Sequence, residues 1–315
     1  MPTQSYNDIF KADPLAFMRK YSVTPADDIG DFGAHAADFP TPSNKLDYEH
    51  RQMQGNRLIG YLDFQKVKHG TTRTVPSNSG VTQVQQASGQ ILVKGDYTVD
   101  PSRVKSYFLP WLNNAIISLA IPAYDSTQPL GTNPRYFFTA AINGCSVFVK
   151  GTPQSPVVYH AGGNTGTKSP QAGAKVWRDL MQSHNQTQGV LAAEVNKTMY
   201  VTDKTNKAKG TQHSREFTQW MESNLGGTYL IEDVAPTGCV MGVREGGAWT
   251  FYLQENITVT YSRFTRQVNR FSKDKKIAVN GSQRIDVRPM MFREIFPNGG
   301  SNAKMVPVLT RAFKG

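Results

Sequence analysis

In the stretch Ile142-Asn143-Gly144-Cys145-Ser146-Val147-Phe148-Val149, a cysteine that follows an Asn-Gly turn opens an apolar, β-branched run. After a turn with two prolines, a second apolar run ends on a histidine in Val157-Val158-Tyr159-His160-Ala161-Gly162-Gly163. Runs of this kind, bounded by turn residues, predict two adjacent strands of a hairpin. The start of one strand then lies beside the end of the other, so we expect the Cys145 thiol and the His160 imidazole to meet at one rim of a sheet.

A thiol beside an imidazole is the arrangement that a cysteine nucleophile needs, because a nearby base takes the thiol proton. Gly144 precedes the cysteine and allows a substrate to approach the backbone closely. Ala161, Gly162 and Gly163 leave space beyond the histidine. The alternative interpretation is structural, since cysteine is often buried as a small apolar residue and a histidine at a strand end is often half-exposed surface.

Apolar or β-branched runs separated by Gly, Pro and Asn dominate the chain from residue 90 onward and predict strands. Two helices interrupt them, one starting at Ser169-Pro170 and running to about residue 184, the other over 214–224. The fold class we expect is therefore α+β, an antiparallel-rich β-sandwich core flanked by helices. The expected strands are 91–93, 115–121, 136–142, 146–149, 157–160, 190–201, 228–234, 239–243 and 249–264.

Residues 1–95 are polar and mixed, with turn-rich or low-complexity stretches at 25–43 and 71–89. Asp13 and Pro14 predict one short helix there, as its N-cap and its first residue. We interpret 1–95 as a polar leader or arm that is partly disordered. Residues 96–315 then form the domain that holds the cysteine and the histidine.

The net charge of +11 is concentrated toward the C-terminus. Residues 263–315 contain twelve Lys or Arg and three acidic residues, a balance of +9, whereas the preceding 262 residues have a balance of +2. A basic segment of this kind favours an acidic partner, and we expect an anionic membrane surface rather than a specific nucleic acid. A solvated surface with a charge bias is the alternative.

Several other classes of protein are disfavoured. The six histidines show no metal-ligand spacing, and two cysteines ninety-four residues apart argue against a zinc site or a disulfide framework, so we expect no metal and no cofactor. The N-terminus lacks the basic and apolar regions of a secretory signal peptide. The longest mainly apolar run, 115–123, is too short to span a bilayer, which predicts a soluble protein without a transmembrane segment.

Around the cysteine and the histidine, the chain resembles the catalytic domain of the cytotoxic necrotizing factors and related toxins that deamidate glutamine. Those enzymes have a Leu-Ser-Gly-Cys-Thr segment that leads into an apolar strand, then a catalytic histidine at the end of the next strand, at a similar spacing. Gly144, Cys145 and His160 match this pattern, whereas this chain has Ile, Asn and Ser where the pattern has Leu, Ser and Thr. The resemblance covers residues 135–164 and is carried by a short motif.

The resemblance implies a β-sandwich surrounded by helices and a cysteine-dependent protein-glutamine deamidase or transglutaminase. In that reaction His160 deprotonates Cys145, and backbone N–H groups near Gly144 hold the oxyanion, with Asn143 and Ser146 beside the approach of the substrate. The third catalytic element of the family is commonly a backbone carbonyl or a small polar side chain on an upstream strand. The apolar run that follows the two asparagines 113 and 114 is where we expect that strand.

The same resemblance implies a biological setting. The expected substrate is a Rho-type small GTPase of a host cell, whose switch glutamine is needed for GTP hydrolysis. A chain of this length has no room for the receptor-binding and translocation domains of the full-length toxins. We therefore expect an effector toxin that a bacterial injection or secretion apparatus delivers into the host cytoplasm.

Two other functions remain open. A non-enzymatic basic protein that binds nucleic acid, or that forms part of a particle, would use the segment 263–314 for phosphate contacts. A cysteine protease would use the same nucleophile and base, so the sequence does not separate side-chain amides from peptide bonds. The second cysteine, Cys239, also follows a glycine, but no histidine comes after it, and we interpret it as a buried strand residue.

Overall fold

The computed structural model describes residues 4–30, 36–38, 49–54, 59–67, 72–77, 80–86, 90–129, 132–162, 170–183, 191–196, 199–200, 229–267, 275–278, 283–298 and 305–306. The helices in this part of the chain are α1 (Tyr6–Ala12), α2 (Pro14–Lys20) and α3 (Pro170–Ser183). None of them is both long enough and apolar enough to cross a membrane. The strands are β1 (Ser22–Pro25), β2 (Ala36–Asp38), β3 (Glu49–Met53), β4 (Ile59–Lys66), β5 (Thr72–Ser77), β6 (Gly80–Gln86), β7 (Gln90–Asp96), β8 (Val104–Leu109), β9 (Ala115–Ala120), β10 (Tyr136–Thr139), β11 (Ser146–Thr152), β12 (Ser155–Ala161), β13 (Leu191–Val195), β14 (Tyr229–Glu245), β15 (Ala248–Gln267), β16 (Lys275–Ala278), β17 (Gln283–Phe296) and β18 (Met305–Val306).

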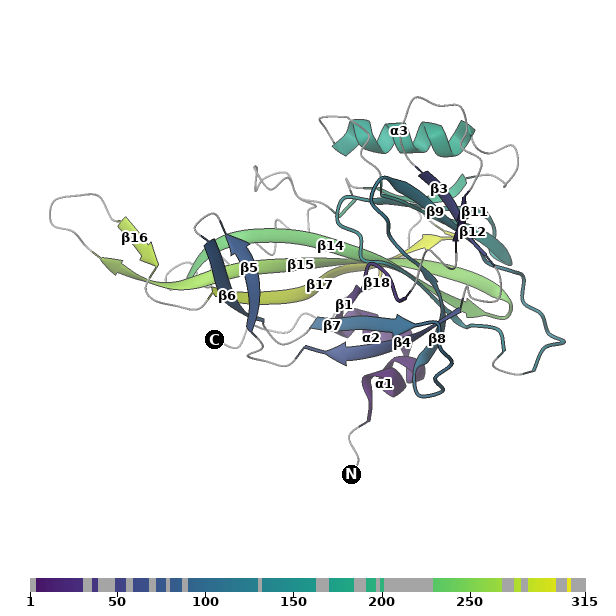
Figure 1. The fold of residues 1–315 in the computed structure, drawn as a ribbon, viewed down its shortest axis with the longest axis horizontal. Coiled ribbons are helices and arrows are strands. Elements are labelled where there is room, and N and C mark those ends of the chain that lie inside the picture. The colour runs from purple at the N-terminus through teal and green to yellow at the C-terminus, as the bar shows by residue number, and fades with distance from the viewer. Residues whose placement is uncertain are drawn as a thin grey trace.

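The strands form two sheets (Figure 1). The larger sheet has twelve strands in the order β1-β7-β4-β8-β10-β14-β15-β17-β6-β5, with β16 and β18 paired to β15 and β17. The smaller sheet has six strands in the order β13-β11-β12-β9-β3-β2. Among the described strands, the pairing is parallel at β1–β7, β8–β10, β3–β9 and β6–β17 and antiparallel elsewhere. The coarser part of the expected fold, a strand-rich mixed fold of helices and sheets, is therefore confirmed.

Three apolar clusters separate the layers of the molecule. The first lies between the two sheets and contains Val147 and Val158 from the smaller sheet and Val240 and Leu253 from the larger. The second lies between the larger sheet and helices α1 and α2, and the third between the smaller sheet and α3. Figure 1 shows this succession from α1 and α2 at the bottom to α3 at the top. Helices are few and the two sheets differ in size, so the expected sandwich is matched only loosely.

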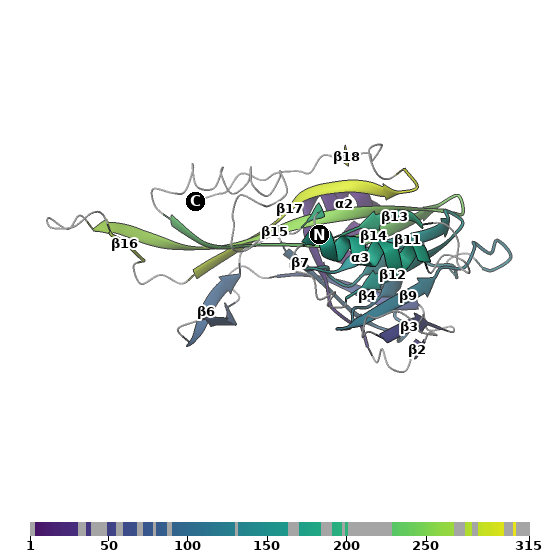
Figure 2. The ribbon, with the colours of Figure 1, turned by 90° about the horizontal axis from the view of Figure 1, so that it is seen from above.

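The hairpin of β14 and β15 is the longest pairing among the described strands and reaches beyond the layered part of the molecule, as Figure 2 shows from above. Gly246 and Gly247 form its two-residue turn, with positive φ angles of 55° and 83° that favour glycine. Within the layered part, Val240 enters the cluster between the sheets, whereas Cys239 and Met241 enter the cluster under α1 and α2. Alternation along one strand thus supplies both cores.

Several described segments of 1–95, the region that we interpreted as a polar leader or arm, lie within the layered fold. Helices α1 and α2 cover one face of the larger sheet. Their side chains Phe10 and Phe17 are among the most deeply buried of the described residues. The local sequence explains both helices, because Ser5 caps α1 and Asp13 caps α2 ahead of Pro14. Strands β4 and β7 lie inside the larger sheet, so the described part of this region belongs to the same fold as the rest.

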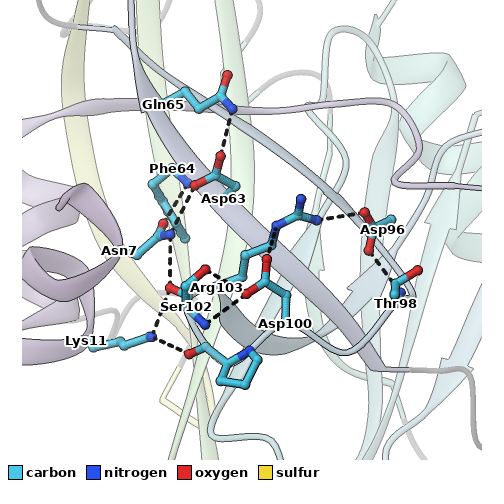
Figure 3. A network of polar contacts seen from close by, with 11 residues as sticks. Asn7, Lys11, Asp63, Phe64, Gln65, Asp96, Thr98, Asp100, Ser102 and Arg103 are labelled. Atoms are coloured by element: carbon cyan, nitrogen blue, oxygen red, sulfur yellow. Dashed lines mark hydrogen bonds and ion pairs between the residues drawn. The ribbon is translucent and has the colours of Figure 1, made fainter.

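Polar contacts also connect α1 to the sheet (Figure 3). The Asn7 side-chain amide donates a hydrogen bond of 3.0 Å to Asp63, and its carbonyl oxygen accepts one of 2.8 Å from the Phe64 N–H. Beside them, Arg103 forms an ion pair of 2.7 Å with Asp96. The two hydrogen bonds of Asn7 fix the first helix at one position on strand β4.

Gln254 of β15 connects the N-terminal segment to the C-terminal half of the chain. Its side chain is wholly buried, and its Oε1 accepts a hydrogen bond of 2.9 Å from the Val23 N–H. Its Nε2 donates to the carbonyls of Met18 and Tyr21. A single amide thereby satisfies backbone groups at the end of α2 and the start of β1.

The strand predictions differ from the structure in both the bounds and the number of strands. The expected strands 228–234 and 239–243 are parts of one strand, β14, which continues through Pro236. The strands that the sequence does not predict are β1–β6, β8 and β16–β18. Strand β17 places part of the basic segment 263–315 in the core, where Val287 and Phe292 are buried. The expected helix over 214–224 lies outside the described residues.

Replacement of Phe10 by alanine is expected to lower the free energy of unfolding by about 3–5 kcal/mol, because it removes a wholly buried ring that packs on Phe64 and Phe138. The matched control is Gln4→Ala, which changes an exposed residue just before α1 and is expected to stay within about 0.5 kcal/mol of the wild type. Urea denaturation followed by circular dichroism measures both. Equal stabilities of the two variants would mean that the N-terminal helices are dispensable.

Candidate functional site

Cys145 lies in the connection between β10 and β11, one residue before β11 begins. This connection is fixed to the larger sheet three residues earlier, where Ile142 and Gly238 exchange two backbone hydrogen bonds of 2.7 and 2.9 Å. Gly144 then adopts a φ of 104°, a backbone conformation that favours glycine. The turn delivers the cysteine to the rim of the smaller sheet, where the residue is 9% exposed.

Tyr200 holds this turn in place. Its hydroxyl accepts a hydrogen bond of 3.1 Å from the Gly144 N–H and donates one to the carbonyl of Cys145. The side chain is wholly buried, and burial raises the pKa of the phenol well above its ordinary value, so the hydroxyl keeps its proton. The N–H of Gly144, an expected oxyanion donor, is therefore already engaged. No local pattern in the sequence connects Tyr200 to a turn more than fifty residues earlier, so this residue is not among the predicted site residues.

His160 stands opposite Val147 in the register of β11 and β12, and Val147 packs with Cys145 in the cluster between the sheets. Residues directly opposite each other in an antiparallel pair share a face, and so do residues two apart on one strand. Cys145 and His160 are therefore diagonal neighbours on the same face of the hairpin, a relation that typically separates residues by about 7–8 Å.

The imidazole of His160 is buried, at 1% exposure, and neither ring nitrogen has a hydrogen-bond partner. Burial lowers the pKa of His160 to about 4, and the nearby backbone carbonyls of Pro110 and Leu109 counteract part of that effect. At neutral pH the ring is uncharged, which is the form that accepts a proton. The carbonyls near the ring thus come from the end of β8 and the residue after it, ahead of the strand in which we expected a third element.

The same segment covers Gly162, which lies opposite Cys145 when the register of β11 and β12 is continued by one residue. A β-carbon at Gly162 would lie 2.4 Å from Nε1 of Trp111 and 2.7 Å from the carbonyl oxygen of Leu112. The Trp111 Nε1 atom is buried and has no hydrogen-bond partner. An unpartnered indole N–H therefore lies against the glycine beside the thiol, in space that a side chain at position 162 would fill.

The two remaining residues of the expected site lie elsewhere. Asn143 is exposed on the turn before the cysteine. Ser146 is buried and pairs with Ala161, which packs in the cluster under α3. Because consecutive strand residues point to opposite faces, Ser146 points away from the face that holds Cys145 and does not border the thiol as we expected.

The second thiol has a different environment. Cys239 is wholly buried in the cluster under α1 and α2, with its Sγ 3.8 Å from the carbonyl oxygen of Val23. Burial raises the pKa of the Cys239 thiol to about 12, so almost none of it is thiolate near neutral pH. Its interpretation as a buried strand residue is confirmed.

The Cys145 thiol and the uncharged His160 imidazole therefore lie on one face of the hairpin, at the edge of an apolar core, with the indole N–H of Trp111 against Gly162. No hydrogen bond joins the thiol to the imidazole. These groups suit acyl transfer through a thioester, in which the thiol is the nucleophile, the imidazole is the base and an N–H group stabilises the oxyanion. Within the described ranges, no group of three or more His, Cys, Asp or Glu side chains is arranged to hold a metal ion.

The difference between the two thiols predicts selective alkylation. With iodoacetamide near pH 7.5, we expect Cys145 to be modified at least tenfold faster than Cys239, because only Cys145 lies at a rim while Cys239 is sealed in a core that suppresses its thiolate. Peptide mass spectrometry over a time course measures the two rates in the native protein. Equal and slow labelling of both residues would assign Cys145 a structural role instead.

Burial of His160 predicts a loss of stability in acid. In the unfolded chain the imidazole titrates near 6.5, whereas in the folded protein it stays unprotonated until about pH 4. Between these values the unfolded state binds more protons, so the free energy of unfolding falls as the pH drops, by on the order of 3 kcal/mol in total. Urea denaturation at pH 7, 5.5 and 4.5 should show a shallower fall in His160→Gln. Parallel curves for the two proteins would contradict the burial of an uncharged ring.

Comparisons with known proteins do not assign this chain to a family. No protein-family model matches it, and a search of curated proteins finds no match either. The chemical interpretation of the site therefore rests on the geometry of the described residues and on the short motif around Cys145 and His160.

Proposed function

We propose that the chain is a cysteine-dependent protein-glutamine deamidase with Cys145 as the nucleophile and His160 as the base. The observation that carries this proposal is the register of β11 and β12, which brings the two side chains to one face at the rim of the smaller sheet. The other thiol, Cys239, is sealed in a separate core. The apolar cluster shared by the two sheets, with helices on both outer sides, also fits the helix-flanked sandwich that the motif implies.

The reaction begins when the uncharged imidazole of His160 takes the proton of the Cys145 thiol. The thiolate attacks the side-chain amide carbon of a glutamine, forming a carbon–sulfur bond and an oxyanion. When the carbon–nitrogen bond breaks, the proton on the imidazole passes to the leaving nitrogen, and ammonia departs. Water then attacks the thioester, which yields glutamate and restores the thiol. An amine in place of water yields a transglutamination product by the same route.

Burial shapes the base in a specific way. A ring with a pKa of about 4 is uncharged at neutral pH and can accept a proton, but it is a weaker base than an ordinary imidazole. The same burial makes the imidazolium costly once it forms. The carbonyls of Leu109 and Pro110 offset part of this cost, since they are the groups near the ring that favour its charged form.

In the proposed mechanism, the indole N–H of Trp111 stabilises the oxyanion by donating a hydrogen bond to it. The Gly144 N–H already donates to Tyr200, so it does not serve as the donor without breaking that contact. The Trp111 N–H has no partner and lies against Gly162, on the same face as the thiol. A buried N–H without a partner in the free protein gains a hydrogen bond when the amide oxygen of the substrate enters. That bond strengthens when the oxygen becomes negatively charged, which is how such a donor favours the transition state.

The substrate and the setting of the reaction are proposed from the motif resemblance alone. They comprise a Rho-type small GTPase as the protein substrate and delivery into a host cell by an injection apparatus. Attraction of the basic segment 263–315 to an anionic membrane belongs to the same proposal. Strand β17 lies within that segment, so part of its charge belongs to the folded sheet rather than to a free tail.

Intact-mass spectrometry of candidate GTPases incubated with the protein tests the reaction. We expect a gain of about one dalton in the substrate, which is the mass change when an amide becomes an acid. This gain should be lost with Cys145→Ala and retained with the matched variant Cys239→Ala. Trp111→Phe removes the indole N–H and keeps a smaller aromatic ring at this position, so kcat should fall by about 10²–10³ with a much smaller change in KM.

Other outcomes contradict specific parts of the proposal. Cleavage fragments that depend on Cys145 would identify a protease that uses the same pair. Loss of activity in Cys239→Ala, with Cys145→Ala unaffected, would place the nucleophile elsewhere. A Trp111→Phe variant with unchanged kcat would remove the indole from the mechanism while leaving the thiol and imidazole in place.

A further inference from the structure

The hairpin of β11 and β12 has a second face, turned toward α3 and away from Cys145. Phe148 and Tyr159 are opposite each other in the register and pack there with Trp177 of α3. Lys150 lies on the same face, two residues beyond Phe148, and its Nζ lies 5.4 Å from the centre of the Tyr159 ring. A cationic side chain therefore enters a layer that consists mainly of apolar side chains.

Two polar atoms on this face are buried and have no hydrogen-bond partner among the described residues. Lys150 is wholly buried, and its Nζ has no hydrogen-bond partner. The Tyr159 hydroxyl is likewise buried without a partner. Burial lowers the pKa of Lys150 to about 8 and raises the pKa of Tyr159 above its ordinary value, so at neutral pH both groups are mostly protonated donors. An unpaired buried ammonium costs several kcal/mol, and the nearby aromatic ring returns only part of that cost.

The neighbouring carboxylates are already committed to other groups. Glu194 of β13 stands opposite Phe148, and it accepts hydrogen bonds from Arg178 and from Asn196. Asp179 of α3 is paired with Lys175 on the exposed side of the helix. Val157 and Leu191, which also pack against this cluster, are apolar. Among the described residues, no acceptor is hydrogen-bonded to the Lys150 ammonium or to the Tyr159 hydroxyl.

We propose that Lys150 and Tyr159 form a binding site for a small organic carboxylate beneath α3. The carboxylate would accept hydrogen bonds from the ammonium and from the phenol hydroxyl, which satisfies both orphaned donors with one group. The body of the ligand would pack against the apolar side chains of α3 and the smaller sheet. The site is separate from the cysteine and the histidine, which occupy the opposite face of the same two strands.

The charge and the surroundings select this class of ligand. One ammonium and one hydroxyl balance a single negative charge, whereas a phosphate dianion would retain an uncompensated charge in a region of low dielectric. Chloride would satisfy the charge but would leave the apolar layer around it without contacts. A carboxylate with a hydrocarbon body uses both the donors and the apolar wall formed by Trp177, Leu180 and Met181.

Thermal unfolding of the full chain in matched salts tests the site. Sodium acetate, butyrate and benzoate are compared with sodium chloride and inorganic phosphate at equal ionic strength and pH 7. We expect the carboxylates to raise Tm, with butyrate and benzoate more effective than acetate, because a ligand that binds only the folded state stabilises it. The fluorescence of Trp177, which packs on the same face, should change over the same concentration range.

Three variants make the result decisive. Lys150→Met removes the charge at nearly equal volume and should abolish the response to carboxylates while raising Tm in plain buffer. Tyr159→Phe removes only the hydroxyl and should weaken the response. Lys175→Met, which alters an exposed lysine of α3, should respond like the wild type. The proposal is overturned if carboxylates do not raise Tm in the wild type, if chloride and phosphate match them, or if Lys150→Met responds equally.

Discussion

Alternate side chains of β14 and β15 enter two different cores, and this two-sided burial is the constraint on which the other layers depend. A sheet that is apolar on both faces is stable in water only when both faces are covered. Here the N-terminal helices cover one face and the smaller sheet covers the other. The smaller sheet is then itself apolar on both faces, and α3 covers its outer side. The position of Cys145 follows from this stacking, since the turn that carries it is hydrogen-bonded to β14 at Gly238.

The hairpin of β11 and β12 concentrates the unusual electrostatics of the molecule. On one face an imidazole is buried without a hydrogen-bond partner, and on the other an ammonium is buried in the same condition. Each arrangement opposes folding, because desolvation disfavours charge and an unmade hydrogen bond has no compensation. Buried polar groups without hydrogen-bond partners are tolerated only where surrounding layers fix the backbone. Here β9 and β13 flank the hairpin on either side. Groups held in this way gain most from a ligand or a transition state that supplies the missing partner.

The sequence predicts what depends on neighbours along the chain and misses what depends on distant ones. The strands around Cys145 and His160, and the helix that starts at Pro170, follow from local periodicity and turn residues. Strand β4 is not predicted from the sequence because its alternation of polar and apolar residues is short and lies in a region with an overall polar composition. Phe10 and Phe17 lie on two short helices whose burial depends on strands more than forty residues away. Tyr200 and Trp111 meet the cysteine turn and the histidine strand only through tertiary packing, which no local pattern encodes.

The hydrogen bonds of Gln254 have a consequence for the way the chain folds during synthesis. They join residues separated by more than 230 positions, and the core beneath α1 and α2 also requires Phe292 from the last long strand. The first helices therefore leave the ribosome long before the sheet that buries them exists. Folding dominated by contacts of this range is slow, and the phenylalanines of the N-terminal segment stay accessible throughout that interval. Protection of roughly the first twenty residues from aggregation, by a chaperone or by transient local structure, is thus a requirement of the architecture itself.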